Sequence, residues 1–127
     1  MSILENFRAF NFEAGVPYVS VTSSGVTFNK AVTIKLGYPA HVLLLFDENT
    51  KRMALQSCNA DTPNATTFYK ENKNKILSVR WNGRDLLNTI EDITGWDLSK
   101  TGYRINGSIL REENAMLFDL NTATALN

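Results

Sequence analysis

The fold is decided by the stretch SGVTFNKAVTIKLG, residues 24–37. Polar and apolar residues alternate on both sides of a turn-forming Ser-Ser-Gly at 23–25, which predicts a hairpin over residues 18–28. Asn29 is a suitable N-cap for a short helix, and Gly37 is expected to end that helix in the left-handed conformation. The stretch therefore predicts a hairpin that runs directly into a short helix.

A second hairpin is expected directly after this helix. The apolar segment 41–47 predicts a strand, and DENT at 47–50 predicts a turn. Residues 51–56 predict the partner strand, because Met53 and Leu55 alternate with more polar neighbours. The first half of the chain thus predicts the order hairpin, helix, hairpin.

The second half of the chain repeats much of this order. A strand is predicted at 76–81, a helix at 82–94 with Asn82 as its N-cap, and a hairpin over 103–120. Asn29 and Asn82 are 53 residues apart, and each follows a strand that ends in an aromatic residue. We interpret this as an internal repeat whose two units pack together, because units of this size bury little core alone.

These elements are expected to form a single domain over residues 1–127. Repeat 1 covers about 16–57, a polar, turn-rich linker covers 58–75, and repeat 2 covers about 76–120. The tail after residue 120 carries no apolar anchor and is expected to fray. The predicted fold is a β-rich α+β domain in which two strand–helix–hairpin repeats form a pseudo-dimeric barrel. A mixed sheet with the second helix on one face is the competing topology.

The first unit, residues 24–37 followed by the apolar run at 42–46, resembles the swapped-hairpin DNA-binding domains of the AbrB, MazE and MraZ group. The shared pattern is a turn glycine (Gly25), an alternating strand, a short helix ending in Leu-Gly, and an apolar hairpin. Val26 stands where that group usually has arginine, and Asn29 where it usually has proline. In the group two units interleave into a small barrel, and MraZ-like members carry both units in one chain. The resemblance implies a swapped-hairpin barrel and DNA binding.

Composition excludes several classes of functional site. The chain has 127 residues, with 13 basic and 13 acidic residues, one histidine (His41) and one cysteine (Cys58). A single thiol forms no internal disulfide, and one imidazole with one thiol does not make the usual zinc sites. His41 is expected where the strand 41–47 begins and Cys58 just after the strand 51–56 ends, with no sign that they meet. We therefore expect no enzyme activity, no catalytic residues, no metal and no cofactor.

Five basic residues are the candidates for DNA contacts. They are Lys30, Arg80 and Arg84, at or near the helix starts, and Lys51 and Arg52, in the hairpin over 41–56. Helix starts favour anions, so basic side chains there are suited to phosphate groups. The alternative interpretation is an ordinary solvated surface, which the zero net charge favours.

The functional prediction is a non-enzymatic DNA-binding module resembling a transcription regulator, with duplex DNA as its partner. The alternative is a scaffold for protein–protein interaction or homo-oligomerisation. An apolar strip containing Phe7, Phe10 and Phe12, in an N-terminal segment with helical periodicity, favours this alternative. The basic segment with Lys70, Lys73 and Lys75 is interpreted mainly as a soluble linker.

No membrane segment or secretory signal is expected. The longest uninterrupted apolar run is 42–46, which is far shorter than a membrane span. The N-terminus lacks a basic region followed by a long apolar one. With a single thiol, these features predict a cytoplasmic location.

Overall fold

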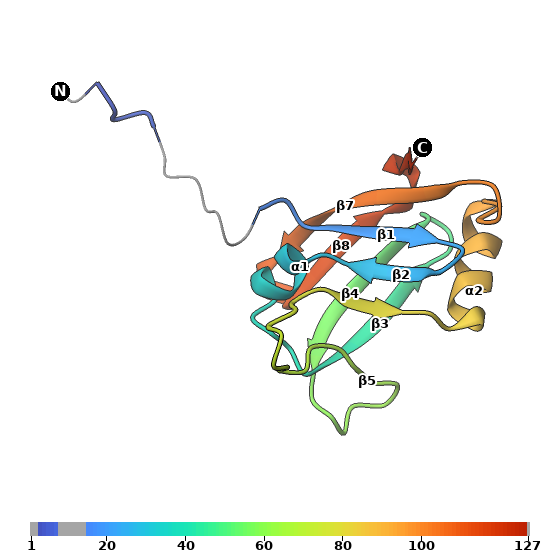
Figure 1. The fold of residues 1–127 in the computed structure, drawn as a ribbon, viewed down its shortest axis with the longest axis horizontal. Helices are drawn as coiled ribbons and strands as arrows, with labels where there is room; N and C mark the ends of the chain where they lie inside the picture. Colours follow the sequence, from blue (N-terminus) through green and yellow to red (C-terminus); the bar gives the residue numbers. More distant parts are fainter. Residues whose placement is uncertain (1–2, 8–14, 127) are drawn as a thin grey trace.

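Strands dominate the part of the chain that the computed structural model describes, residues 3–7 and 15–126. One curled antiparallel sheet, a half-barrel, runs in the order β5-β3-β4-β8-β7-β1-β2-β6, and β9 pairs with β7 beside this path (Figure 1). The strands are β1 (Tyr18–Thr22), β2 (Gly25–Phe28), β3 (His41–Asp47), β4 (Arg52–Cys58), β5 (Thr66–Thr67), β6 (Val79–Trp81), β7 (Gly102–Leu110), β8 (Ala115–Asp119) and β9 (Thr124–Leu126). The helices are α1 (Lys30–Lys35) and α2 (Arg84–Thr94), with 3-10 turns at Arg111–Glu113 and Leu120–Thr122. The prediction of a small, β-rich α+β fold is confirmed.

The start of α1 is fixed by Asn29, as the sequence predicts. Its side-chain oxygen accepts hydrogen bonds from the backbone N–H of Val32 (3.3 Å) and of Tyr18 (3.0 Å). Its amide group donates to the carbonyl of Val16 at 2.8 Å. Asn29 therefore caps the helix and also ties it to the start of β1, while Gly37 follows the helix with a φ of 80°.

The predicted cap of the second helix is wrong. The N-cap of α2 is Gly83, in an extended conformation and with no side-chain hydrogen bond, and Asn82 lies one residue outside. The strand before the helix is also shorter than predicted, since β6 begins at Val79 rather than residue 76. Gly95, with a φ of 79°, ends the helix in the left-handed conformation.

The core lies inside the curl of the sheet, and Phe28 is at its centre. The Phe28 ring is fully buried and meets the rings of Phe68, Trp81 and Phe118 at centroid distances of 5.7, 5.2 and 5.8 Å. Val32 from α1 also joins this core, as do the two buried apolar side chains of α2. The two helices lie at opposite ends of the sheet (Figure 1).

The segment 58–75 does more than connect the two halves. Its strand β5 pairs with the start of β3, and Phe68 inserts into the core with only 5% of its surface exposed. The backbone N–H of Phe68 donates to the carbonyl of Ala40 at 2.8 Å. A buried aromatic residue thus anchors a stretch that the sequence presents as polar and turn-rich.

The C-terminal tail is ordered against the sheet, so the prediction that it frays is wrong. Residues 124–126 form β9, which pairs with β7 from Gly102 to Arg104. The side chain of Asp119 stabilises the turn between β8 and β9 by accepting a hydrogen bond from the backbone N–H of Asn121 at 3.0 Å. At the other end, Phe10 and Phe12 of the expected N-terminal strip lie outside the described residues, whereas Phe7 is 72% exposed.

Three strand pairings join the two predicted repeats, β1–β7, β2–β6 and β4–β8, and the registers of the last two are symmetric. In β2–β6, Thr27 pairs with Arg80, which lies 53 residues further along the chain. In β4–β8, Ala54 pairs with Leu117, and the pairs on either side are Met53 with Phe118 and Leu55 with Met116. Each of these two pairings therefore places residues that correspond in the predicted repeat around a central pair.

None of the helices in the described part is long and apolar enough to cross a membrane.

Candidate nucleic-acid interface

The outer surface of β7, β1, β2 and β6 is polar. Val19, Val21 and Ile105 point into the core, so their neighbours along each strand point outward. We call this surface the polar face; it consists of Tyr18, Ser20, Thr22, Thr27, Arg80, Arg104 and Asn106, with Lys30 and Lys75 beside it. Arg80, Arg104 and both lysines are exposed.

Strand register places a row of four side chains across this face. Ser20 pairs with Arg104 on one side and with Thr27 on the other, and Thr27 pairs with Arg80. Three inter-strand spacings of about 4.8 Å separate the two arginine backbones, roughly 14 Å in total. Two guanidinium groups therefore flank two hydroxyl groups across four strands.

Contacts within the face position both arginines. The Arg104 guanidinium carbon lies 3.7 Å from the centroid of the Tyr18 ring, a cation–π arrangement. Arg80 donates from Nη2 to the carbonyl of Ser24 at 3.0 Å, which directs it toward the β1–β2 turn. These contacts reduce the freedom of both side chains without neutralising their charge.

A hollow of about 490 Å³ lies at the α1 end of the face. Tyr18, Ser20 and Thr27 line it from the sheet, and Lys30 and Lys75 line it from its edge. None of β1, β2, β6 or β7 contains Asp or Glu. The polar face therefore presents hydroxyl donors and positive charge, a combination suited to an anionic ligand.

The structure brings together only part of the predicted DNA-contact set. Lys30 and Arg80 belong to the polar face. Arg84 begins α2, which leaves the antiparallel β2–β6 pair at the opposite end from α1 (Figure 1). Lys51 and Arg52 lie in the β3–β4 hairpin, where Arg52 Nη2 is 3.8 Å from the carboxylate of Asp47.

The histidine and the cysteine lie closer together than the sequence predicts. His41 and Cys58 are direct cross-strand partners in β3–β4, and both are half-buried. Within residues 3–7 and 15–126 no group of three or more His, Cys, Asp or Glu side chains is placed to hold a metal ion. Cross-strand proximity alone supplies no third group to orient the imidazole, as nucleophilic catalysis requires.

Sequence reasoning missed Arg104 and Tyr18 as parts of one site. The alternation of Arg104 with apolar Ile105 indicates an outward arginine on a strand. The proximity of Arg104 to Tyr18 depends on the pairing of β1 with β7, which are about 80 residues apart in sequence. No local pattern encodes such a pairing.

Comparison with known proteins adds no assignment, since no protein-family model, curated protein or solved structure matches the chain. The resemblance to the AbrB, MazE and MraZ group therefore stays a prediction.

Proposed function

We propose that the chain is a non-enzymatic DNA-binding module that contacts the phosphates of duplex DNA with its polar face. One observation carries the proposal: a chain with equal numbers of acidic and basic residues keeps the four strands of this face free of carboxylates. Arg80, Arg104, Lys30 and Lys75 supply its positive charge. A local patch is what a neutral chain needs to bind a polyanion.

The dimensions of the face suit a DNA groove. The roughly 14 Å between the Arg80 and Arg104 backbones is close to the width of the major groove, about 12 Å. The two arginines are thus spaced to reach phosphates on both sides of a groove, with the hydroxyls of Ser20 and Thr27 between them. Lys30 and Lys75 extend the contact toward α1.

We also propose that the sheet consists of two related units arranged about a pseudo-two-fold axis, as in a swapped-hairpin barrel. The symmetric registers of β2–β6 and β4–β8 support this, as does the location of α1 and α2 at opposite ends. The axis passes between Thr27 and Arg80, in the row that crosses the polar face. A transcription-regulator role follows from this arrangement together with DNA binding.

The test is the salt dependence of duplex binding, measured by fluorescence anisotropy. Each phosphate contact contributes about 0.9 to the slope of log K against log salt, so Arg80→Ala with Arg104→Ala is expected to reduce the slope by about 2. Arg111→Ala with Lys100→Ala removes the same charge from exposed positions elsewhere and is expected to leave the slope unchanged.

Single variants test two other residues of the predicted DNA-contact set. Lys30→Ala is expected to reduce the slope by about 1, and Arg84→Ala to have little effect because it lies at the opposite end of β2–β6. A wild-type chain that shows no salt-sensitive association with duplex DNA at low ionic strength contradicts the proposal. Equal slope losses for the polar-face pair and the control pair also contradict it.

A further inference from the structure

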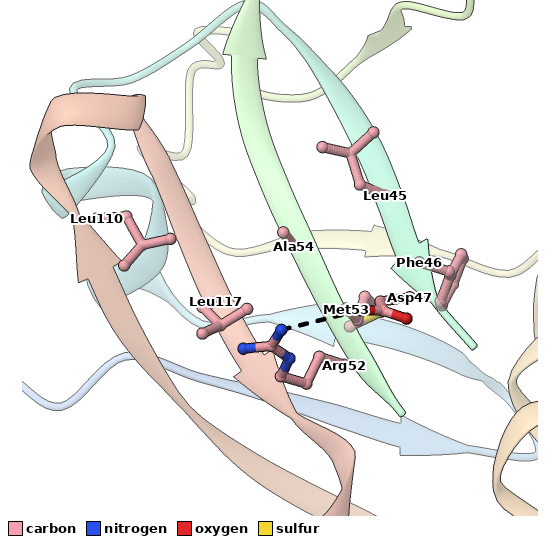
Figure 2. Close-up of a pocket in the computed structure, with 8 residues that line it drawn as sticks. All are labelled: Leu45, Phe46, Asp47, Arg52, Met53, Ala54, Leu110 and Leu117. Atoms are coloured by element: carbon pink, nitrogen blue, oxygen red, sulfur yellow. Dashed lines mark ion pairs between the residues drawn. The ribbon is translucent and has the colours of Figure 1, made fainter. Parts of the chain in front are cut away.

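A second surface of the sheet is apolar and lies on β3, β4, β8 and the C-terminal end of β7, beyond Arg104 of the polar row. We call it the apolar face; it consists of the outward residues Leu43, Leu45, Ala54, Leu117 and Leu110. Figure 2 shows the last four on β3, β4, β8 and β7 respectively, around a shallow hollow of about 290 Å³. Leu45 is 43% exposed and Leu110 is 37% exposed. Apolar side chains gathered on one sheet face are typical of a contact surface.

We propose that this face binds the same face of a second copy of the chain, related by a two-fold axis parallel to the strands. In such a dimer β4 lies opposite β8 of the second copy, and β3 lies opposite its β7. Residues at the same level along the strands then meet across the interface. Aligned packing of two sheets, offset by their twist of about 30°, has this geometry.

Charge complementarity selects this axis. Arg52 on β4 and Asp119 on β8 are cross-strand partners, so they lie at the same level of the apolar face. The proposed axis places Arg52 opposite Asp119 of the second copy, and Asp119 opposite Arg52 of the second copy. A two-fold axis perpendicular to the strands instead places Arg52 at the level of Gln56 of the second copy, which carries no carboxylate on these strands. Opposite charges that meet twice across one interface fix its register.

The apolar residues are complementary under the same operation. Ala54 pairs with Leu117 in the sheet, so the axis places Ala54 of one copy opposite Leu117 of the other, and Leu117 opposite Ala54. The level containing Leu43 and Gln56 also contains Leu110, which brings Leu43 opposite Leu110 of the second copy. Small residues therefore face large ones, including Leu45 opposite Ser108, and Leu43 faces Leu110, as close packing between sheets requires.

The size of the face indicates a weak dimer. Four strands about 4.8 Å apart and three levels about 6.8 Å apart cover roughly 400 Å² per copy, or about 800 Å² for two copies. Stable interfaces bury about 1,600 Å², so association is expected at tens of micromolar or above. The row of arginines and hydroxyls on the polar face stays free in this dimer, so the proposal does not depend on DNA binding.

The experiment is sedimentation velocity from about 1 µM to about 1 mM, without DNA. Leu45→Glu is expected to raise the dimer dissociation constant at least tenfold, because it places two carboxylates in the apolar contact. Lys100→Glu changes an exposed side chain elsewhere and is expected to leave the constant unchanged. A wild-type chain that is monomeric at about 1 mM overturns the proposal, as does a Leu45→Glu variant that associates as tightly as wild type.

Charge reversal tests the register directly. Arg52→Glu and Asp119→Lys each place like charges opposite each other in their own homodimers and are expected to weaken association about tenfold. An equimolar mixture is expected to restore it to within about threefold of wild type, because both ion pairs in the mixed dimer then have opposite signs. The carboxylate introduced by Arg52→Glu lies near Asp47 of its own chain both alone and in the mixture, so this repulsion does not affect the comparison.

Asp119 also caps the turn that follows β8, so circular dichroism must first show that Asp119→Lys is folded. If it is unfolded, Arg52→Glu and Leu45→Glu test the proposal without it. Each is still expected to raise the dimer dissociation constant about tenfold, and an unchanged constant overturns the proposal. A mixture of two folded variants that associates no better than either alone overturns the proposed axis.

Discussion

Replacing Phe28 by leucine is expected to lower the free energy of unfolding by about 3 kcal/mol. The substitution keeps most of the apolar volume, and a swap of this kind by itself costs under about 1.5 kcal/mol. It also removes three ring contacts, with Phe68, Trp81 and Phe118, each worth about 0.5–1.5 kcal/mol beyond burial. For a chain of 127 residues this loss corresponds to a fall in melting temperature of about 10 °C.

Urea unfolding followed by tryptophan fluorescence measures this loss, since Trp81 contacts the substituted ring. Phe46→Leu is the matched control, because Phe46 is only half-buried at the margin of the core and is expected to cost under about 1.5 kcal/mol. Equal losses for Phe28→Leu and Phe46→Leu would refute the central position of Phe28.

Three further changes test other parts of the fold. Ile90→Ala is expected to cost about 2–5 kcal/mol and Asp92→Ala under about 0.5 kcal/mol, because only Ile90 faces the core; chemical denaturation compares them. Ser57→Ala is expected to raise the melting temperature, because the Ser57 hydroxyl oxygen is buried with no hydrogen-bond partner among the described residues. The pKa of Asp47 lies below its ordinary value of 3.8, mainly because the Thr50 hydroxyl hydrogen-bonds to the carboxylate. The backbone N–H groups of Thr50 and Asn49 lower the pKa further. The resulting stabilisation is present above pH 3.8 and is lost as pH falls through the lower folded-state pKa, and Thr50→Val is expected to raise that pKa in an NMR titration.

Local chemistry made much of the fold predictable. Asn29 caps α1 because its side chain matches the free N–H groups of a helix start, and a cap of this kind depends only on nearby residues. The β3–β4 hairpin likewise follows from alternation and a polar turn. The cap at Gly83 was missed because asparagine is the stronger local signal, although the backbone places Gly83 at the helix boundary.

Long-range pairing limited the prediction of the site. Lys30 and Arg80 were found because each lies beside a helix start, but neither residue alone indicates a shared face. The pairings of β1 with β7 and of β2 with β6 bring Arg104 and Arg80 into one row. Such pairings depend on which apolar faces bury each other across the whole chain, so short sequence windows do not contain them. The ordered tail was missed for the same reason, because β9 is held by its pairing with β7.

We propose that the polar face is the surface that binds DNA. Titration of the isotopically labelled chain with a short duplex, followed by amide chemical shifts, tests it residue by residue. We expect the largest changes at Ser20, Thr27, Arg80 and Arg104, decreasing as salt is added. Changes confined to the β3–β4 hairpin or to α2, or no change at low salt, would contradict the claim.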